Sequence, residues 1–197
     1  MRKIIAFLMV SLNGYHEGPK PWDLEWHHVD DEFNEFAVEQ LDASGDLIFG
    51  RMTYQGMAQY WPSPMALEND SAAVASRMNK APKIVVSRTL QKPEPEWANT
   101  RLISDDVAGE LRKLKERPGK ELLVMGSDQL TTSLMEMGLL DELRIIVNPV
   151  LLGGGHSLFR SGRAKTELKL LSTRTFRNGN VLLTYQPLPT NSIKPSK

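Results

Sequence analysis

Three short apolar runs in this chain each end at a small residue that leads into a polar turn. Leu47–Phe49 leads into Gly50-Arg51-Met52-Thr53-Tyr54, and the arrangement recurs at Val85–Arg88 and at Val124–Ser127. A buried strand that ends in such a turn and continues as a helix leaves free N–H groups, which favour an anion. One turn of this kind is weak evidence, whereas three together predict a clamp for a nucleotide.

The first of these turns illustrates the chemistry. Gly50 allows a ligand to approach the backbone closely, and the Arg51 guanidinium faces the negative charge that arrives. The Thr53 hydroxyl is predicted to cap the helix that follows.

Short apolar runs alternate along the chain with segments of helical periodicity. This order predicts a three-layer α/β/α domain with a mostly parallel central sheet, and Asn178-Gly179 predicts an antiparallel C-terminal hairpin. In such sheets ligands bind beyond the carboxyl ends of the strands, which is where the three turns lie. The predicted strands are Ile4–Val10, Leu47–Phe49, Lys83–Ser87, Leu102–Ile103, Leu122–Met125, Leu143–Val147, Leu168–Phe176 and Val181–Gln186, and the predicted helices lie near residues 30–41, 53–60, 71–79, 106–117 and 130–137.

The balance of charges and the absence of cysteine exclude several classes of protein. Lys and Arg together number 24, as do Asp and Glu, which argues against a nucleic-acid binder that relies on a basic surface. The chain has no cysteine, so it has neither a disulfide framework nor a thiolate metal site.

The N-terminus superficially resembles a signal peptide, because Met1-Arg2-Lys3 precedes the apolar run Ile4–Val10. That run is short, and the segment Ser11–Gly14 reads as a loop rather than a cleavage site, so a strand is predicted. No run approaches the length that a membrane span needs. We therefore expect a soluble, cytoplasmic protein with a single domain over residues 1–188 and a disordered tail over 189–197.

Five motifs, in order along the chain, resemble the dihydrofolate-reductase-like superfamily. The resemblance covers about Lys3 to Gln186 and is greatest to the branch that contains the riboflavin-pathway pyrimidine reductase domain. The matching segments are Ser11-Leu12-Asn13-Gly14, Gly50-Arg51-Met52-Thr53-Tyr54, Val86-Ser87-Arg88-Thr89-Leu90, Gly126-Ser127-Asp128-Gln129-Leu130, and Leu139–Leu143 leading into Asn148–Gly155 and Leu158-Phe159.

The resemblance implies that the chain binds NADPH. Arg51 and Arg88 match the positions where the family holds the adenosine 2′-phosphate, and Ser87 can add a hydroxyl donor. The turn that starts at Gly126 would direct N–H groups and a helix dipole at the pyrophosphate. The alternative is that these glycines only permit tight turns and that the arginines are solvated. The full set of predicted cofactor residues is Met9, Ser11, Gly50, Arg51, Met52, Thr53, Ser87, Arg88, Gly126, Ser127, Asp128, Gln129 and Leu130.

The chain departs from the family pattern at three points. Asn13 stands where the pyrimidine-reductase branch typically has Asp, so no titratable proton is available there. Ser127 replaces the second glycine of the pyrophosphate turn. The first helix has Asn34 near the position where dihydrofolate reductases carry a carboxylate. The nearby acids Asp30, Asp31 and Glu35 fit a solvated helix start or face as well as a site. No catalytic residue is therefore assigned.

The predicted substrate pocket lies between the end of the first strand, the loop from Asn13 to Trp26, and the first helix. Phe33 fits a pocket or the core equally well, His16 fits a substrate contact or an exposed loop, and of Trp22 and Trp26 one is expected to line the pocket and one to pack. The pocket candidates are Asn13, His16, Trp22, Asp30, Phe33, Leu152, Gly153 and Gly154.

Two further patterns resemble a metal site and a phosphate-binding loop. The adjacent residues His27 and His28, with His16 and His156, lack the ligand spacing of a metal site, so no metal is predicted. Gly153-Gly154-Gly155 resembles a phosphate loop, but no Lys-Ser or Lys-Thr follows, which excludes a P-loop. These glycines either admit a ligand or form a tight connection.

The sequence thus predicts an NADPH-dependent reductase of a small heterocyclic (pyrimidine- or pterin-like) or carbonyl substrate. The nicotinamide would supply the hydride. The protein would bind and orient the reactants and would exclude water. The alternative is an NADPH-binding sensor or partner-binding protein without turnover. A homodimer is expected, with no nucleic-acid partner and no membrane partner.

Overall fold

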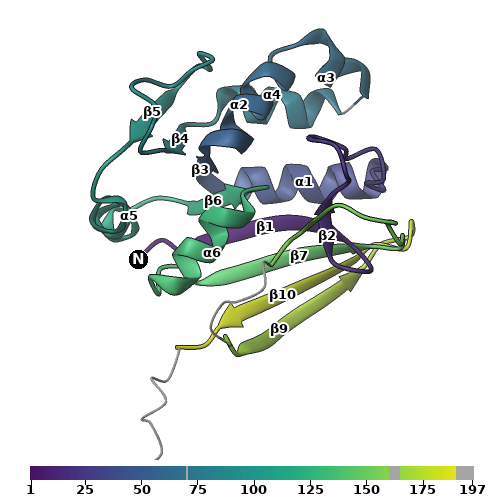
Figure 1. Ribbon diagram of the computed structural model, residues 1–197. Coiled ribbons are helices and arrows are strands. Elements are labelled where there is room, and N and C mark those ends of the chain that lie inside the picture. The colour runs from purple at the N-terminus through teal and green to yellow at the C-terminus, as the bar shows by residue number, and fades with distance from the viewer. Residues whose placement is uncertain (70, 160–164, 190–197) are drawn as a thin grey trace, which may run out of the picture.

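A computed structural model describes residues 1–69, 71–159 and 165–189, and these form an α/β domain around one large sheet (Figure 1). The described sheet has the strand order β5-β4-β3-β6-β1-β7-β10-β9. Its strands are β1 (Ile4–Ser11), β3 (Ser44–Gly50), β4 (Lys83–Val86), β5 (Thr100–Ile103), β6 (Glu121–Met125), β7 (Glu142–Asn148), β9 (Leu168–Thr175) and β10 (Val181–Pro187). The first six run parallel, and β10 pairs antiparallel with both β7 and β9, which confirms the predicted sheet and hairpin.

Helices cover both faces of the sheet. They are α1 (Asp31–Ala43), α2 (Arg51–Tyr60), α3 (Pro64–Asn69), α4 (Ala72–Lys80), α5 (Val107–Glu116) and α6 (Asp128–Glu136). Core residues of α1, α2 and α4 belong to one hydrophobic cluster, and those of α5 and α6 belong to another. The two clusters on opposite faces confirm the three-layer architecture.

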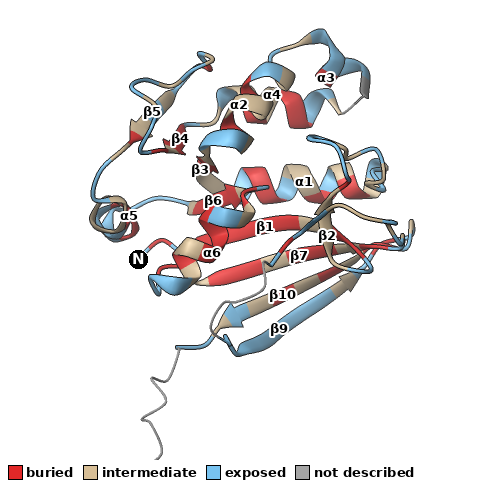
Figure 2. Ribbon diagram, viewed as in Figure 1, coloured by how far each residue is buried: buried red, intermediate tan, exposed pale blue. Residues whose placement is uncertain are grey.

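Strand β1 lies at the centre of the sheet and supplies residues to both clusters. Ile4, Ala6 and Leu8 pack with α5 and α6, whereas Ile5 and Phe7 pack with α1 and α2, because successive side chains of a strand point to opposite faces. Its partners are distant in sequence, since Ile4–Phe7 pairs with Leu122–Met125 of β6 and Ile5–Ser11 pairs with β7. The continuous apolar run is thus explained by burial on both sides (Figure 2).

The structure adds elements that local periodicity did not indicate. Strand β3 begins at Ser44, ahead of its apolar run, because Ser44 and Asp46 pair with β6. A two-stranded ribbon joins β2 (Tyr15–Glu17) to β8 (His156–Ser157), and its strands come from segments predicted as loops. The segment after Trp61 forms the short helix α3, with Pro64 as its first residue.

The C-terminal hairpin is the least buried part of the sheet. Asn178-Gly179 turns the chain between β9 and β10, with Gly179 at a φ of 91°. Strand β9 forms an edge and is exposed along nearly all its length, as its pale blue arrow shows in Figure 2. The predicted disordered tail falls, from residue 190 onward, outside the described residues.

Within the described residues, no helix is both long enough and apolar enough to cross a bilayer.

Candidate cofactor and substrate site

The three predicted anion turns lie along one edge of the sheet. Gly50 and Val86 are the last residues of the neighbouring strands β3 and β4, and they pair with each other. Arg51 therefore lies one residue beyond the end of β3, and Arg88 lies two residues beyond the end of β4. Strand β6 is in register with β3 on one side and with β1 on the other, which brings the Gly126 turn to the same edge. We call these segments, Gly50–Thr53, Ser87–Arg88 and Gly126–Leu130, the turn side.

The turns after β3 and β6 are bonded directly to each other. The Gly50 N–H donates to Ser127 Oγ at 3.0 Å, and that hydroxyl donates to the Met125 carbonyl at 3.1 Å. The Thr53 hydroxyl donates to the Gly126 carbonyl at 3.2 Å. Gly126 has a φ of 58°, and a Cβ there would lie 3.4 Å from Thr53 Cγ2. The two turns therefore form one rigid unit.

This geometry corrects the predicted role of Thr53. Helix α2 begins at Arg51, and Gly50 is its N-cap without any side-chain capping bond. Thr53 sits in the first turn and points its hydroxyl at the neighbouring loop. The prediction that Thr53 caps the helix is therefore wrong, and the first N–H groups of α2 have no side-chain cap.

The turn side carries positive charge without an acidic partner. Arg51 and Arg88 are both exposed, and neither forms an ion pair with any residue of the described ranges. The first turn of α2 contains no acidic residue, so the positive end of its dipole is not neutralised from within. The uncapped helix start and the two exposed guanidinium groups are features that favour an anion.

Three other predicted cofactor residues have side chains that serve the fold. Ser87 is buried, and its hydroxyl accepts from the Thr89 N–H at 3.2 Å and the Leu90 N–H at 3.1 Å, which shapes the loop that carries Arg88. Ser11 is buried at the end of β1 and donates to Asn13 Oδ1 at 2.9 Å. Leu130 lies in the core against Gly50, so only its backbone can face a ligand.

The remaining predicted cofactor residues have mixed properties. Asp128 opens α6 with a carboxylate, which reduces the attraction of that helix start for an anion, and Gln129 beside it is exposed. Met9 is half-buried on the α1 face of β1, and Met52 is exposed at the start of α2. On the turn side, the features that favour an anion thus come mainly from α2 and the two arginines.

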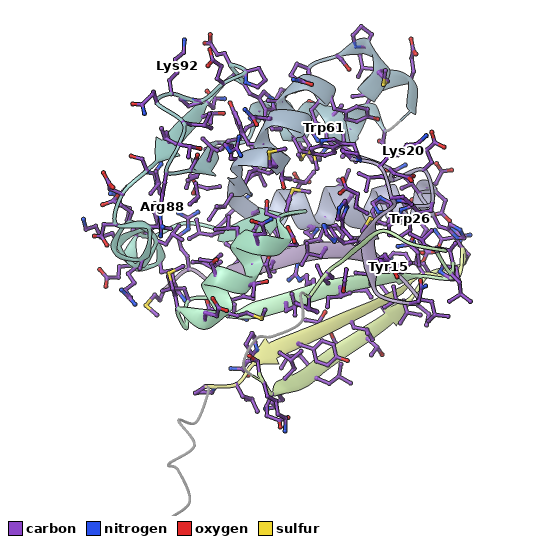
Figure 3. All side chains as sticks on the ribbon, in the orientation of Figure 1. Tyr15, Lys20, Trp26, Trp61, Arg88 and Lys92 are labelled. Atoms are coloured by element: carbon purple, nitrogen blue, oxygen red, sulfur yellow. The ribbon has the colours of Figure 1, made fainter. Side chains whose placement is uncertain are left out.

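The opposite part of the same edge is built from long loops. The segment 12–29, which we call the strap, follows β1, and the segment 149–155 follows β7. Together they form the loop side. In Figure 3, Arg88 of the turn side and Trp26 of the strap lie at opposite sides of the molecule.

Asn13 joins the two loops of the loop side. Its amide nitrogen donates to the Leu152 carbonyl at 2.8 Å, and its Oδ1 accepts from the Leu152 N–H at 3.1 Å. An aspartate could accept from Leu152 but could not donate to it. Asn13, which stands where the pyrimidine-reductase branch typically has Asp, is therefore a clasp between the two loops and not a free polar group.

The glycines after Leu152 have different environments. A Cβ at Gly153 or Gly154 would meet no atom within 4 Å, so neither position needs a glycine for packing. Gly155 has a φ of 146°, and a Cβ there would lie 2.2 Å from the Glu17 carbonyl oxygen. Gly155 therefore permits the β2–β8 contact, which supports the tight-connection alternative.

The other predicted pocket residues mostly hold the strap or the core. His16 bonds through Nδ1 to the His156 carbonyl at 2.8 Å. Asp30 is the N-cap of α1 and accepts from the Phe33 N–H at 2.9 Å. Phe33 is buried in an aromatic cluster with Phe36 and Phe176, so of its two predicted roles the structure supports the core. The Trp22 ring rests on α2, where a Cβ built on Gly56 would lie 1.9 Å from its Cζ2 atom.

Sequence reasoning missed the polar anchor of the strap. Asn148 is fully buried at the end of β7, where Nδ2 donates to the Val10 carbonyl at 3.2 Å and Oδ1 accepts from the His28 N–H at 2.9 Å. The Asn180 amide donates to the His28 carbonyl at 2.8 Å. The Asn-Pro pair at residues 148 and 149 signalled the end of a strand, but nothing local pointed to a partner 120 residues away.

His27, next to this anchor, is neutral at physiological pH. Burial lowers its pKa to about 4. Its Nε2 is buried without a hydrogen-bond partner, and the ring meets Trp26 edge-on, with centroids 4.4 Å apart. His27 is thus an uncharged imidazole inside the strap.

A separate cavity of about 590 Å³ lies on the α6 face of the sheet, away from the arginines. Its lining is almost entirely apolar, and includes Ile145, Leu158 and Leu183. It offers no charge for a phosphate, so it is not the site that the turns indicate. Among the described residues, no three His, Asp or Glu side chains gather as a possible metal site.

Comparisons with known proteins agree with this fold. A family model of the RibD C-terminal domain matches residues 2–182. The uncharacterized protein YyaP of Bacillus subtilis (strain 168) is 32% identical over 186 residues, covering 93% of this chain and 94% of the relative.

Solved structures share the fold at lower identity. A candidate riboflavin biosynthesis protein from Shewanella sp. PV-4 superposes with a TM-score of 0.71 at 22% identity, covering 94% of this chain and 99% of that chain. A diaminohydroxyphosphoribosylaminopyrimidine deaminase/5-amino-6-(5-phosphoribosylamino)uracil reductase from Thermotoga maritima gives a TM-score of 0.60 at 15% identity, covering 95% of this chain and 57% of that chain. The chain therefore belongs to the RibD C-terminal domain family, within the dihydrofolate-reductase-like superfamily.

Proposed function

We propose that the chain is an NADPH-dependent reductase of a small heterocyclic, pyrimidine- or pterin-like, or carbonyl substrate. The observation that carries the proposal is the pair of exposed, unpaired arginines at the uncapped start of α2 and on the adjacent loop after β4. Two guanidinium groups at neighbouring strand ends suit a phosphate with several acceptor oxygens. Family membership supports the same conclusion, because a relative with this fold is named a reductase.

The residues of the turn side fit such a cofactor. Arg51 and Arg88 would hold the 2′-phosphate, and the N–H groups at the starts of α2 and α6 would hold the pyrophosphate. Gly126 has a positive φ, at which any side chain would strain the backbone. Because glycine has no side chain, a ligand could approach the backbone of that turn. When bound, NADPH would supply a hydride. The protein would orient the substrate beside β1 and exclude water beneath the strap.

The decisive experiment separates the 2′-phosphate from the rest of the dinucleotide. Arg51→Glu and Arg88→Glu together should weaken NADPH binding by about 100-fold or more, because two attractive contacts become repulsive, and should weaken NADH binding much less. Titration by fluorescence or calorimetry measures both. Arg112→Glu, an exposed position on α5, is the matched control and should change neither affinity. Equal losses for NADPH and NADH would contradict the assignment.

A non-catalytic NADPH-binding protein is the second candidate, and Asn13 favours it. An amide has no titratable proton near neutral pH, so no acid stands where the pyrimidine-reductase branch typically has Asp. The amide of Asn13 is moreover bonded to Leu152 and Ser11. Absorbance decay of NADPH against a panel of pyrimidines, pterins and dicarbonyls distinguishes the two. Binding without oxidation across a broad panel would favour the second candidate.

We also propose that the chain forms a homodimer through β9. This edge strand exposes Leu168, Leu170 and Leu171, with 51% of Leu170 accessible to solvent. An exposed apolar edge is a template for pairing with another strand. Light scattering at several concentrations tests this, and Leu170→Lys should shift the equilibrium to the monomer.

A further inference from the structure

A groove of about 450 Å³ lies on the α1 face of the sheet, between α1 and the C-terminal hairpin. Residues of β7 and β10 form its floor, and β9 borders it on the side away from α1. The residues that β7 contributes, Glu142 and Arg144, stand at the amino end of that strand, whereas the turn side lies at the carboxyl ends of its strands. The groove is therefore separate from the candidate cofactor site.

Three polar side chains form a row across the floor of this groove. Thr184 of β10 pairs with Arg144 of β7 on one side and with Ser172 of β9 on the other, so the three side chains share one face of the sheet. The register of β9 shifts next to this row, and Leu171 is the extra residue. Such a bulge changes the direction of a side chain, and Leu171 also lines the groove. The strand pairing thus places hydrogen-bonding groups beside an apolar one.

The hydroxyl of Thr184 is the most informative group in the row. Only 7% of Thr184 is accessible to solvent, yet within the described residues its hydroxyl has no hydrogen-bond partner. The Ser172 hydroxyl, in the same part of the chain, has none either. Buried polar groups in proteins are nearly always hydrogen-bonded. The partner of the Thr184 hydroxyl must therefore enter through the groove.

Arg144 and Gln40 of α1 add N–H groups to the same groove. Arg144 donates through Nε to Glu142 at 2.7 Å and through Nη1 to Gln40 Oε1 at 3.1 Å, which fixes the plane of the guanidinium. Among the described residues, neither Arg144 Nη2 nor Gln40 Nε2 has an acceptor. Glu142 is shared with Lys3, whose Nζ lies 3.6 Å from its Oε2, so these three residues carry one surplus positive charge. The floor thus offers free donors and a single net positive charge.

The walls of the groove are apolar, and a balanced ion pair stands at its rim. Phe36, Leu171 and Leu182 line it beside the polar row. Arg174 lies over the Phe36 ring, with its Cζ 5.6 Å from the ring centroid, and pairs with Glu39 of α1 at 3.6 Å. Glu39 is mostly exposed, so solvent weakens its effect on the floor. A ligand that fits must therefore combine hydrogen-bond acceptors with an apolar part.

We propose that this groove is a second ligand site and that it binds small organic carboxylates. The carboxylate accepts from Arg144 Nη2, Thr184 and Ser172, and a short apolar body lies against Leu171 and Leu182. The single surplus charge suits a monoanion better than a phosphate, whose second charge would lie near Glu142 without compensation. This site does not depend on the proposed function.

The test uses benzoate, which joins a carboxylate to an apolar ring, and benzamide, its uncharged counterpart. Titration followed by two-dimensional NMR of the amide groups should give saturable shifts at Ser172, Thr184 and the Gln40 side chain, while Gly50 and Gly126 stay unshifted. Benzamide should bind at least about 10-fold more weakly, because it cannot form charge-assisted hydrogen bonds. Lack of saturation up to about 50 mM benzoate, or equal binding of the two compounds, would overturn the proposal.

Thr184→Val separates a binding role of the hydroxyl from a structural one. Valine has nearly the same shape, and the hydroxyl has no internal bond to lose, so the urea midpoint should stay unchanged or rise. Benzoate affinity should nevertheless fall about fivefold. Thr132→Val is the matched control, because Thr132 is equally buried at 7% but lies on α6, and it should leave benzoate affinity unchanged. An unchanged affinity in Thr184→Val would overturn the proposal.

Two further variants locate the bound carboxylate. Arg144→Lys keeps a positive charge beside Glu142 but loses the planar fork, and it should weaken benzoate binding about 10-fold. Arg51→Glu with Arg88→Glu should leave benzoate affinity unchanged, because both arginines lie on the turn side. Loss of benzoate binding only in this double variant would place the carboxylate there and overturn the proposal. Failure of the wild type to bind NADPH would end the proposed function without altering any of these results.

Discussion

The turn side and the loop side occupy the same edge of one sheet but are held in different ways. On the turn side, short connections after β3 and β6 bond to each other within a few residues of their strands. On the loop side, contacts between residues far apart in sequence hold the segments. Asn13 bonds to Leu152, the β2–β8 ribbon pairs part of the strap, and Asn148 and Asn180 bond to His28. The turns after β3 and β6 are therefore joined close to their strands, whereas the loop side is held by contacts that depend on distant parts of the chain. Under the proposed function, the turn side would hold the cofactor and the loop side would cover the substrate.

The largest expected effect tests the loop side at Asn148. Asn148→Ala removes a fully buried amide and leaves the Val10 carbonyl and the His28 N–H without that partner, at a cost of about 2–3 kcal/mol in unfolding free energy. Urea denaturation measures this. Hydrogen exchange should also rise across the strap more than across Gly126–Leu130. Asn34→Ala on α1 serves as the control, and equal effects of the two variants would show that the Asn148 anchor does not hold the strap.

The next effect is a pH dependence that arises on the loop side. Because burial lowers the folded-state pKa of His27 to about 4, the unfolded chain binds a proton below about pH 6.5 while the folded chain does not. Unfolding free energy should therefore fall between pH 6.5 and 4, by about 2 kcal/mol from this group. His27→Gln should reduce that slope. Urea midpoints of the wild type and of His27→Gln, measured between pH 6.5 and 4, test this prediction. An unchanged slope in the variant would show that a group other than His27 causes the pH dependence.

A smaller effect compares one glycine from each side. Gly126→Ala should cost about 1–2 kcal/mol, because its φ of 58° is left-handed and its new Cβ would crowd Thr53. Gly153→Ala should change unfolding free energy by less than about 0.5 kcal/mol, since open space surrounds that position. Thermal melts of the two variants give the comparison. Equal losses would show that the loop side is as rigid as the turn side.

The same division explains how much of the structure could be predicted from the sequence. The parallel sheet, the hairpin at Asn178-Gly179 and the positions of the three turns follow from local patterns of apolar and turn residues. The β2–β8 ribbon, the Asn148 anchor and the contact of Trp22 with Gly56 could not be predicted, because each joins segments without a periodic signal. Lys83 is similar: its place in a strand was predicted, but not its burial among the carbonyls of Asn79, Ala81 and Ala98.

Within the candidate site, motifs identified the positions of residues better than their roles. Thr53, Ser87 and Ser127 were predicted as ligand contacts or caps, yet their hydroxyls bond to neighbouring backbone. Short polar side chains compete for whichever backbone group lies nearest, and that group is fixed only when the strands assemble. Arg51 and Arg88 are exposed and have no ion-pair partner among the described residues, which fits both the predicted ligand contact and the alternative that they are solvated.

The placement of β1 has a consequence for how the protein is made. Strand β1 is synthesised before its partners β6 and β7, so Ile4 must wait for Leu122, and Ile5 for Glu142. Strand β1, which is buried on both faces, thus stays incompletely paired until β7 has been synthesised, which takes several seconds at roughly 5–20 residues per second. During those seconds its apolar run is the segment most in need of a chaperone.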